Sequence, residues 1–296
     1  MWTLRAWFAV LSLIAPRAAG RLGLRLFCTP RRHHAPAWER EIAAGGKRTR
    51  IGLLAATIWP AAPASPPVLL LHGWEGRGTQ LGRFVDPFVA GGYRVIALDL
   101  PAHGDSGGAR TDLMECTEAL RKAGRDLGPL AAVVAHSFGG AVTTLALERG
   151  LDVRSVVLIA APSSIEDVIR RFEETVGLRG RGRQAFRSAL ERQTGVTLAD
   201  VEIFERVATL HTPALIVHDR GDREVPFHDA ERLAARWPGS TLLATDTLGH
   251  RRILKDDDVI RRVVDFVSAA TGVSDELPLS PVRDSKSASP ATSQLK

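Results

Sequence analysis

Residues 133–142, VVAHSFGGAV, place a single serine, Ser137, between an apolar run and a pair of glycines. The apolar run AAVVAH (131–136) predicts a short buried strand, and the residues that follow predict a helix near 138–149. Small residues at Ala135, Gly139 and Gly140 suit a tight turn between the two, where larger side chains would collide. A serine at such a turn commonly caps the helix, so this stretch alone leaves a structural role and a chemical role open.

The same alternation continues on both sides of this turn. Apolar runs predict strands at 67–73, 94–99, 154–160, 213–219 and 240–245, and helical patterns lie near 79–91, 112–124, 228–237 and 256–270. Before them, WEREIAA (38–44) and TRIGLLAATIW (49–59) read as two antiparallel strands joined by Gly45 and Gly46. Short apolar strands without polar alternation are typical of a parallel sheet covered by helices on both faces. We therefore expect an α/β fold with a mainly parallel sheet of eight strands.

One connection is much longer than the others. Residues 162–210 are rich in charge and helical spacing and follow a predicted strand, so we expect a helical insertion here. Ligands of open parallel sheets bind beyond the carboxyl ends of the strands, where such an insertion would form a short lid. The tail 272–296 is rich in serine and proline, and we expect it to be disordered.

The string around Ser137 approximates G-x-S-x-G, with Ala135 in place of the first glycine. With it, residues 38–271 resemble the α/β-hydrolase superfamily of esterase-like and lipase-like serine hydrolases, whose triad runs serine, acid, histidine along the chain. This resemblance implies Ser137 as nucleophile, Asp222 as the acid and His250, in the loop after the last strand, as the base. Asp222 lies in GDREVP (221–226), which is similar to the acid loop of the family. Asp219, three residues earlier, is the competing carboxylate.

The resemblance also implies an oxyanion hole made of backbone N–H groups. The candidates are Phe138, directly after the serine, and Trp74, in a string His72-Gly73-Trp74 that is similar to the family motif. We interpret His72 and His136, which end strands, as structural. His103 and Ser106, in the loop DLPAHGDSGG (99–108), are interpreted as loop architecture.

These residues imply acyl transfer, since a serine hydroxyl becomes a nucleophile when a neutral imidazole takes its proton and a carboxylate orients that imidazole. We expect a serine hydrolase that cleaves a small-molecule carboxylic ester through an acyl-enzyme, with no metal and no organic cofactor. A thioesterase or acyltransferase on the same fold is the alternative. A non-catalytic, membrane-tethered binding protein is the second alternative.

Charge is concentrated at the N-terminus. Residues 1–50 carry ten of the 39 lysines and arginines and two of the 33 acidic residues. No nucleic-acid motif accompanies them, and we expect no nucleic-acid partner. AWFAVLSLIAP (6–16) is too short to span a bilayer, and its flanks disfavour a signal peptide. Arg17, Arg21 and Arg25 line one helical face, so residues 1–37 predict a basic arm that lies on an anionic membrane or on the protein's own surface. We expect a cytoplasmic location, with membrane association as an alternative.

Overall fold

Alternate side chains of the central strands enter two separate hydrophobic cores. In strand β3 (Pro67–Leu71), Val68 and Leu70 belong to one core, and Leu69 and Leu71 belong to the other. This alternation follows from the pleat of a strand, whose successive side chains point to opposite faces. The computed structural model describes residues 2–272, with a tail that continues outside the described part. The tail that we expected to be disordered lies outside these residues, apart from Gly272.

The eight strands form one mostly parallel sheet in the order β1-β2-β4-β3-β5-β6-β7-β8. Strand β2 runs antiparallel to both of its neighbours, β1 and β4, and every other pair is parallel. The predicted α/β fold with a mainly parallel sheet is therefore confirmed. The strands are β1 (Lys47–Ile51), β2 (Leu54–Ile58), β3, β4 (Arg94–Leu98), β5 (Leu130–His136), β6 (Val153–Ile159), β7 (Ala214–Asp219) and β8 (Thr241–Thr245).

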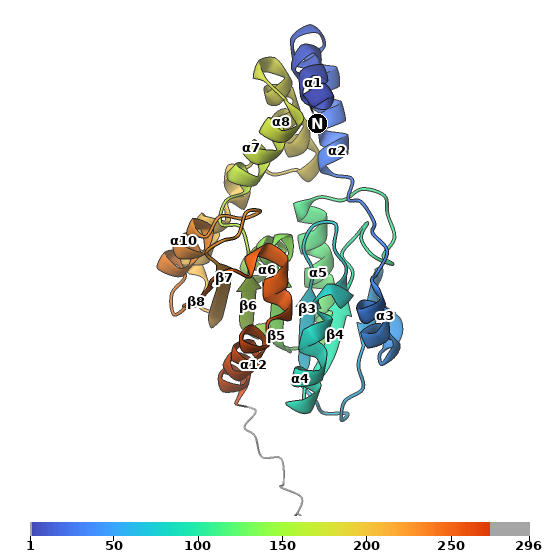
Figure 1. The fold of residues 1–296 in the computed structure, drawn as a ribbon, viewed down its shortest axis with the longest axis vertical. Helices are drawn as coiled ribbons and strands as arrows, with labels where there is room; N and C mark the ends of the chain where they lie inside the picture. Colours follow the sequence, from blue (N-terminus) through green and yellow to red (C-terminus); the bar gives the residue numbers. More distant parts are fainter. Residues whose placement is uncertain (1, 273–296) are drawn as a thin grey trace, which may run out of the picture.

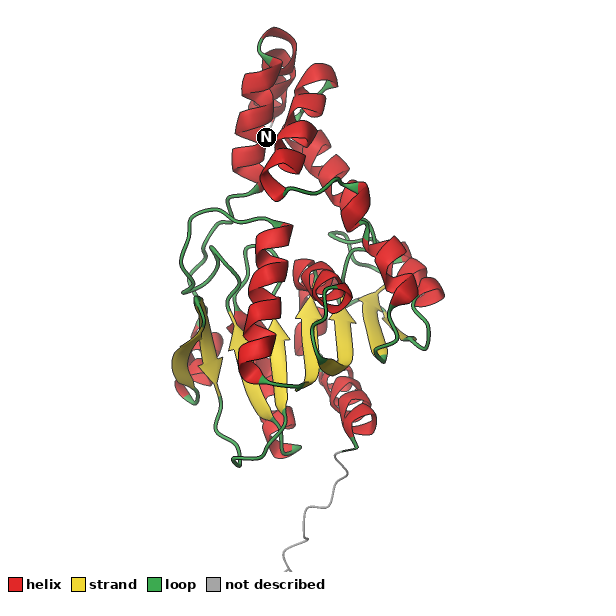
Figure 2. Ribbon diagram, turned by 180° about the vertical axis from the view of Figure 1, so that it is seen from behind, coloured by secondary structure: helices red, strands yellow, loops and turns green. Residues whose placement is uncertain are grey.

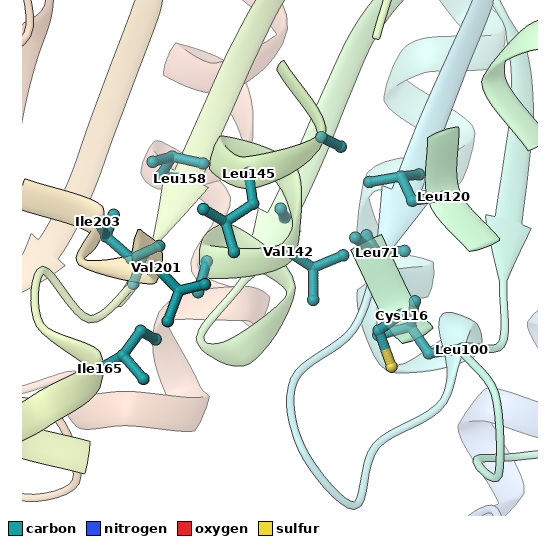
Figure 3. Close-up of a cluster of buried hydrophobic side chains, with 14 of the residues drawn as sticks. Leu71, Leu100, Cys116, Leu120, Val142, Leu145, Leu158, Ile165, Val201 and Ile203 are labelled. Atoms are coloured by element: carbon teal, nitrogen blue, oxygen red, sulfur yellow. The ribbon is translucent and has the colours of Figure 1, made fainter. Parts of the chain in front are cut away.

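Helices cover both faces of this sheet (Figures 1 and 2). On one face, α5 (Leu113–Leu127) and α6 (Phe138–Glu148) bury Leu120, Val142 and Leu145 against Leu71 and Leu158 of the sheet (Figure 3). The other face is covered by η1 (Gly78–Phe84), α4 (Val85–Ala90) and α12 (Asp257–Thr271). The chain also forms α10 (His228–Arg236), α11 (Gly249–Arg252) and η4 (Ile253–Lys255).

The first predicted strand is wrong, because WEREIAA forms the helix α3 (Ala37–Ala44). Glu39 and Ala43, four residues apart on one helical face, are its buried residues. Glu39 accepts hydrogen bonds from Arg77 Nε at 2.6 Å and from Thr79 Oγ1 at 2.9 Å. A buried carboxylate with these partners favours the helix, and the antiparallel pair forms later, with its turn between Ile51 and Leu54.

Two helical hairpins project beyond the sheet (Figure 1). The first consists of α1 (Trp2–Ile14) and α2 (Pro16–Phe27), and the second consists of α7 (Ile165–Val176) and α8 (Gly180–Thr194). We call these four helices the cap. The short helices η2 (Ala199–Val201), α9 (Ile203–Arg206) and η3 (Val207–Thr209) lead from α8 back to β7. Residues 162–210 are thus helical, and the N-terminal residues pack beside them.

Close packing and a buried charge hold the cap together. Helix α2 approaches α8 so closely that a Cβ on Gly20 would lie 2.6 Å from the carbonyl carbon of Ala185. Within the second hairpin, the fully buried carboxylate of Glu173 accepts hydrogen bonds from Arg187 Nε at 2.7 Å and Nη2 at 3.0 Å. The first contact packs α2 on α8, and the second joins α7 to α8.

Candidate active site

Ser137 lies at the turn from β5 to α6 in a strained backbone conformation. Its φ is 52° and its ψ is −119°. Holding a residue with a side chain in this backbone conformation costs about 1–3 kcal/mol. Its N–H donates to the Ile159 carbonyl at 2.8 Å, which ties the turn to the end of β6. Gly139 permits the turn, since a Cβ at this position would lie 2.6 Å from the His72 carbonyl oxygen. The tight turn expected from the sequence is therefore present, with Ser137 at its apex and partly exposed.

Asp222 and His250 lie side by side, although 28 positions separate them in the sequence. Asp222 Oδ2 is 2.7 Å from His250 Nδ1, and both residues are buried. Asp222 Oδ1 accepts the N–H groups of Glu224 at 2.8 Å and Val225 at 3.0 Å. Burial raises the pKa of Asp222, but hydrogen bonds from His218, His250 and Val225 outweigh burial and hold this pKa below its usual range. Asp222 is therefore an anion at neutral pH.

Asp219, the competing carboxylate, has different partners. Its Oδ2 accepts the Thr245 hydroxyl and the Leu248 N–H, both at 2.9 Å, and its Oδ1 accepts the Gly221 N–H at 2.9 Å. The bonds to Thr245 and Leu248 join the end of β7 to the end of β8 and to the loop that follows it. His250 itself lies in the four-residue helix α11, where the sequence predicted a loop. Asp219 thus holds the backbone next to His250 in place, and Asp222 contacts the imidazole of His250.

His136 connects His250 to the turn that carries Ser137. Its Nε2 donates to the His250 carbonyl oxygen at 2.9 Å, and the two rings lie 4.7 Å apart. Burial is the largest reason that the pKa of His136 is lowered to about 3, so its ring is neutral. Within residues 2–272, the Ser137 hydroxyl makes no hydrogen bond to His250 in this structure. The structure nevertheless brings Ser137, Asp222 and His250 to one corner of the fold.

Two backbone N–H groups beside Ser137 have no acceptor among the described residues. One belongs to Phe138, the first residue of α6, and the other to Trp74, which follows Gly73. Gly73 is close to the serine, since a Cβ placed on it would lie 3.0 Å from Ser137 Cβ. The Trp74 ring packs edge-on against Phe138 at 5.2 Å and against His103 at 5.0 Å. These N–H groups are free to bind an oxyanion formed next to Ser137.

His72 supports this loop, as its structural interpretation predicted. Its Nδ1 donates to the Gly73 carbonyl at 2.7 Å, and its Nε2 accepts the Leu100 N–H at 3.0 Å. Burial is the main reason that the pKa of His72 is lowered to about 4. His103 Nδ1 donates to the Pro101 carbonyl at 2.9 Å, and the Ser106 hydroxyl donates to the Asp99 carbonyl at 2.6 Å. All three side chains shape the loops around the site.

The sequence did not indicate the contact between His136 and His250. The two residues are 114 positions apart, and nothing in the sequence of either loop shows that they meet.

A cavity of about 370 Å³ lies elsewhere, between residues 32–35, β1 and β2, and none of the five candidate site residues lines it. The candidate site is therefore defined by the arrangement of its side chains and not by this cavity.

Known proteins resemble this chain in sequence and in fold. Residues 68–263 match a family model described as the alpha/beta hydrolase family. Pimeloyl-[acyl-carrier protein] methyl ester esterase of Aromatoleum aromaticum is 27% identical over 235 residues, which cover 64% of this chain and 92% of that protein. The AB hydrolase superfamily protein YisY of Bacillus subtilis is 24% identical over 242 residues, 67% of this chain and 90% of its own. Among solved structures, an esterase from Exiguobacterium antarcticum superposes with a TM-score of 0.57 at 18% identity, over 75% of this chain and 99% of its own.

Proposed function

Because this chain belongs to the alpha/beta hydrolase family, we propose that it is a serine hydrolase that cleaves carboxylic esters through an acyl-enzyme on Ser137. The observation that carries this proposal is the bond of 2.7 Å between Asp222 and His250, next to the strained turn at Ser137. A distant relative that is a methyl ester esterase supports an ester as substrate. A serine at this turn, in place of an aspartate, supports an acyl-enzyme.

The hydrogen bond between His250 and Asp222 supports a direction for each proton transfer in the proposed mechanism. With His250 Nδ1–H donating to Asp222, the lone pair of Nε2 is available to take the proton of the Ser137 hydroxyl. Oγ then forms a bond to the ester carbonyl carbon, and the carbonyl oxygen becomes an oxyanion that the Trp74 and Phe138 N–H groups stabilise. His250 returns the proton to the departing alcohol. A water molecule, activated by the same imidazole, releases the acid and restores Ser137.

The insertion 162–210 supports a lid role in this proposal. It leaves the sheet at the carboxyl end of β6, the strand whose Ile159 carbonyl accepts the Ser137 N–H. In open α/β sheets ligands bind beyond this end of the strands. We infer that the acyl or alcohol part of the substrate lies between this edge and the helices that follow β6.

Ser137→Ala is the direct test, assayed on a series of p-nitrophenyl esters of increasing acyl length. We expect kcat/KM to fall by about 10⁴-fold or more, since the variant keeps the oxyanion donors and loses the nucleophile. Ser65→Ala, in the loop before the amino end of β3 and so at the opposite edge of the sheet, is the matched control and keeps the wild-type rate. Labelling by a fluorophosphonate is expected in the wild type and the control, and absent in Ser137→Ala.

Two outcomes would contradict the proposal. Equal ester hydrolysis by Ser137→Ala would exclude Ser137 as nucleophile, and a folded wild-type protein that resists the fluorophosphonate would favour a binding protein without catalysis. Hydrolysis of acyl-CoA at rates far above those of oxygen esters would instead support the thioesterase alternative at the same residues.

A further inference from the structure

The solvent-facing side of α1 is apolar, the reverse of what an exposed helix in water normally shows. Phe8 and Ser12 are its buried residues, and they lie on one face. The opposite face carries the exposed side chains Trp7 (48%), Val10 (55%), Leu13 (80%) and Ile14 (76%), without a charge among them. Of the seven large apolar side chains exposed in the described part of the chain, only Leu53 lies outside α1 and α2. An apolar patch concentrated in this way marks an interaction surface.

Positive charge accompanies this apolar face in the first two helices. The first 38 residues contain six arginines and no aspartate or glutamate. Arg17, Arg21 and Arg25 form a row along the exposed face of α2, directly after the apolar end of α1. From the second hairpin, the Arg179 N–H donates to Ser12 Oγ at 3.3 Å, so the segment that carries the exposed Arg179 and Arg181 packs against the second half of α1. The cap thus presents the apolar side chains of α1 together with arginines from α2 and from the start of α8.

We propose that the end of the cap docks onto an anionic phospholipid bilayer, with the apolar face of α1 inserted among the acyl chains. A helix of 13 residues is about 20 Å long, which suits a position in the plane of the interface. Among the described residues, no helix has the length and hydropathy needed to cross a bilayer. The arginines bind lipid phosphates, and Trp7 occupies the headgroup boundary where tryptophan is favoured.

The charge pattern favours lipid over a second copy of this chain. A symmetric dimer through α1 would bring identical surfaces together around a two-fold axis. The arginines of one copy would then lie near the arginines of the other, and no acidic side chain occurs within the first 38 residues to offset their repulsion. An anionic membrane supplies the missing negative charge and the apolar phase together.

Cosedimentation of the full chain with vesicles tests this proposal independently of any esterase activity. The vesicles consist of phosphatidylcholine, with or without one third phosphatidylglycerol. We expect binding to the anionic vesicles, weakened by added salt because screening shortens the range of the arginine charges. The double variant Leu13→Ser/Ile14→Ser is expected to lower the partition coefficient by about tenfold or more, since two large apolar side chains no longer enter the bilayer. The pair Arg17→Gln/Arg21→Gln is expected to remove the preference for phosphatidylglycerol.

Matched controls separate docking from general surface effects. Leu53→Ser alters a leucine that is 88% exposed in the turn between β1 and β2, and Arg149→Gln alters an exposed arginine at the end of α6. Both controls are expected to bind as the wild type does. Unchanged vesicle binding by Leu13→Ser/Ile14→Ser, or no binding of the wild type to either vesicle, would overturn the proposal. So would a dimer in solution that the same double variant abolishes while vesicle binding is absent.

Discussion

At the scale of single residues, the aspartate that ends β7 and the aspartate in the loop after it differ in their partners. Asp222 Oδ2 contacts the imidazole of His250, whereas Asp219 binds Thr245 and the backbone N–H of Leu248. Both are buried and both have pKa values below the usual range, although burial alone would raise them. Their separate partners predict separate consequences of the same chemical change, from carboxylate to amide.

We expect Asp222→Asn to lower kcat by about 10³- to 10⁴-fold, because the amide favours the wrong tautomer of His250, and to lower stability as well, because hydrogen bonds to the ionised carboxylate hold its pKa below the usual range. Asp219→Asn, which replaces one of the two carboxylate oxygens by an amide NH2 group, is expected to lower the stability while changing kcat much less. Kinetics and thermal unfolding on both variants check this. Equal losses of activity without any loss of stability would contradict the division of roles.

The order of the candidate residues along the chain could be predicted from the sequence, but the residues that contact them could not. Ser137, Asp222 and His250 each lie in a short motif that follows a predicted strand, and the carboxyl ends of parallel strands meet at one edge of a sheet. His136 bonds to the His250 carbonyl, and the carboxylate of Asp219 accepts hydrogen bonds from its neighbours. These contacts depend on loop conformations that no local sequence pattern encodes. The sequence therefore predicted candidate catalytic residues, whereas the contacts that support them became visible only in the structure.

At the scale of elements, buried parallel strands were predicted well because their apolar runs are short and bounded by turn residues. The error at residues 38–44 arose where a strand and a one-sided helix share the same composition. The sequence alone left open whether the basic arm lies on the protein's own surface or on a membrane. In the structure, the inner face of α2 packs on the protein, with Gly20 against Ala185. The vesicle experiment tests whether the arginine row on the outer face of α2 binds a membrane.

Gly20→Ala tests the close approach of α2 to α8. Alanine favours a helix over glycine by about 1 kcal/mol, so an open site would gain stability. Since the new Cβ would meet the Ala185 backbone at 2.6 Å, we instead expect a loss of about 1–3 kcal/mol in the free energy of unfolding. Urea denaturation measures it, and Arg21→Ala, the exposed neighbouring position, is the control. A stabilised Gly20→Ala variant would show that the cap helices are separated.

At the scale of the whole molecule, buried neutral histidines couple stability to pH. The pKa values of His72 and His103 are lowered to about 4, and that of His136 to about 3, from an ordinary value of 6.5, with burial as the largest cause in each. Between those limits the unfolded chain binds more protons than the folded one. Stability therefore rises with pH in this window, and acidification below 6.5 removes it.

We expect each of these histidines to contribute up to about 1.4 kcal/mol per pH unit within that window. The urea midpoint at pH 7 compared with pH 5 measures the sum, and His136→Gln is expected to reduce the difference. His211→Gln, at an exposed position, is the control. Asp222 adds its own loss only below its ordinary pKa of 3.8. A midpoint that does not change between pH 7 and pH 5 would contradict this account.

The packing of the first two helices with α8 also means that the contacting helices are synthesised at different times. The contact from Ser12 to Arg179 spans 167 positions, so α1 and α2 are synthesised long before the helix that covers their inner face. At translation rates of about 5–20 residues per second, that interval is roughly ten seconds or more. Throughout it the nascent hairpin exposes both its inner and its outer apolar side chains. A chaperone or a lipid surface that binds these side chains during synthesis would therefore meet them before the α/β sheet is complete.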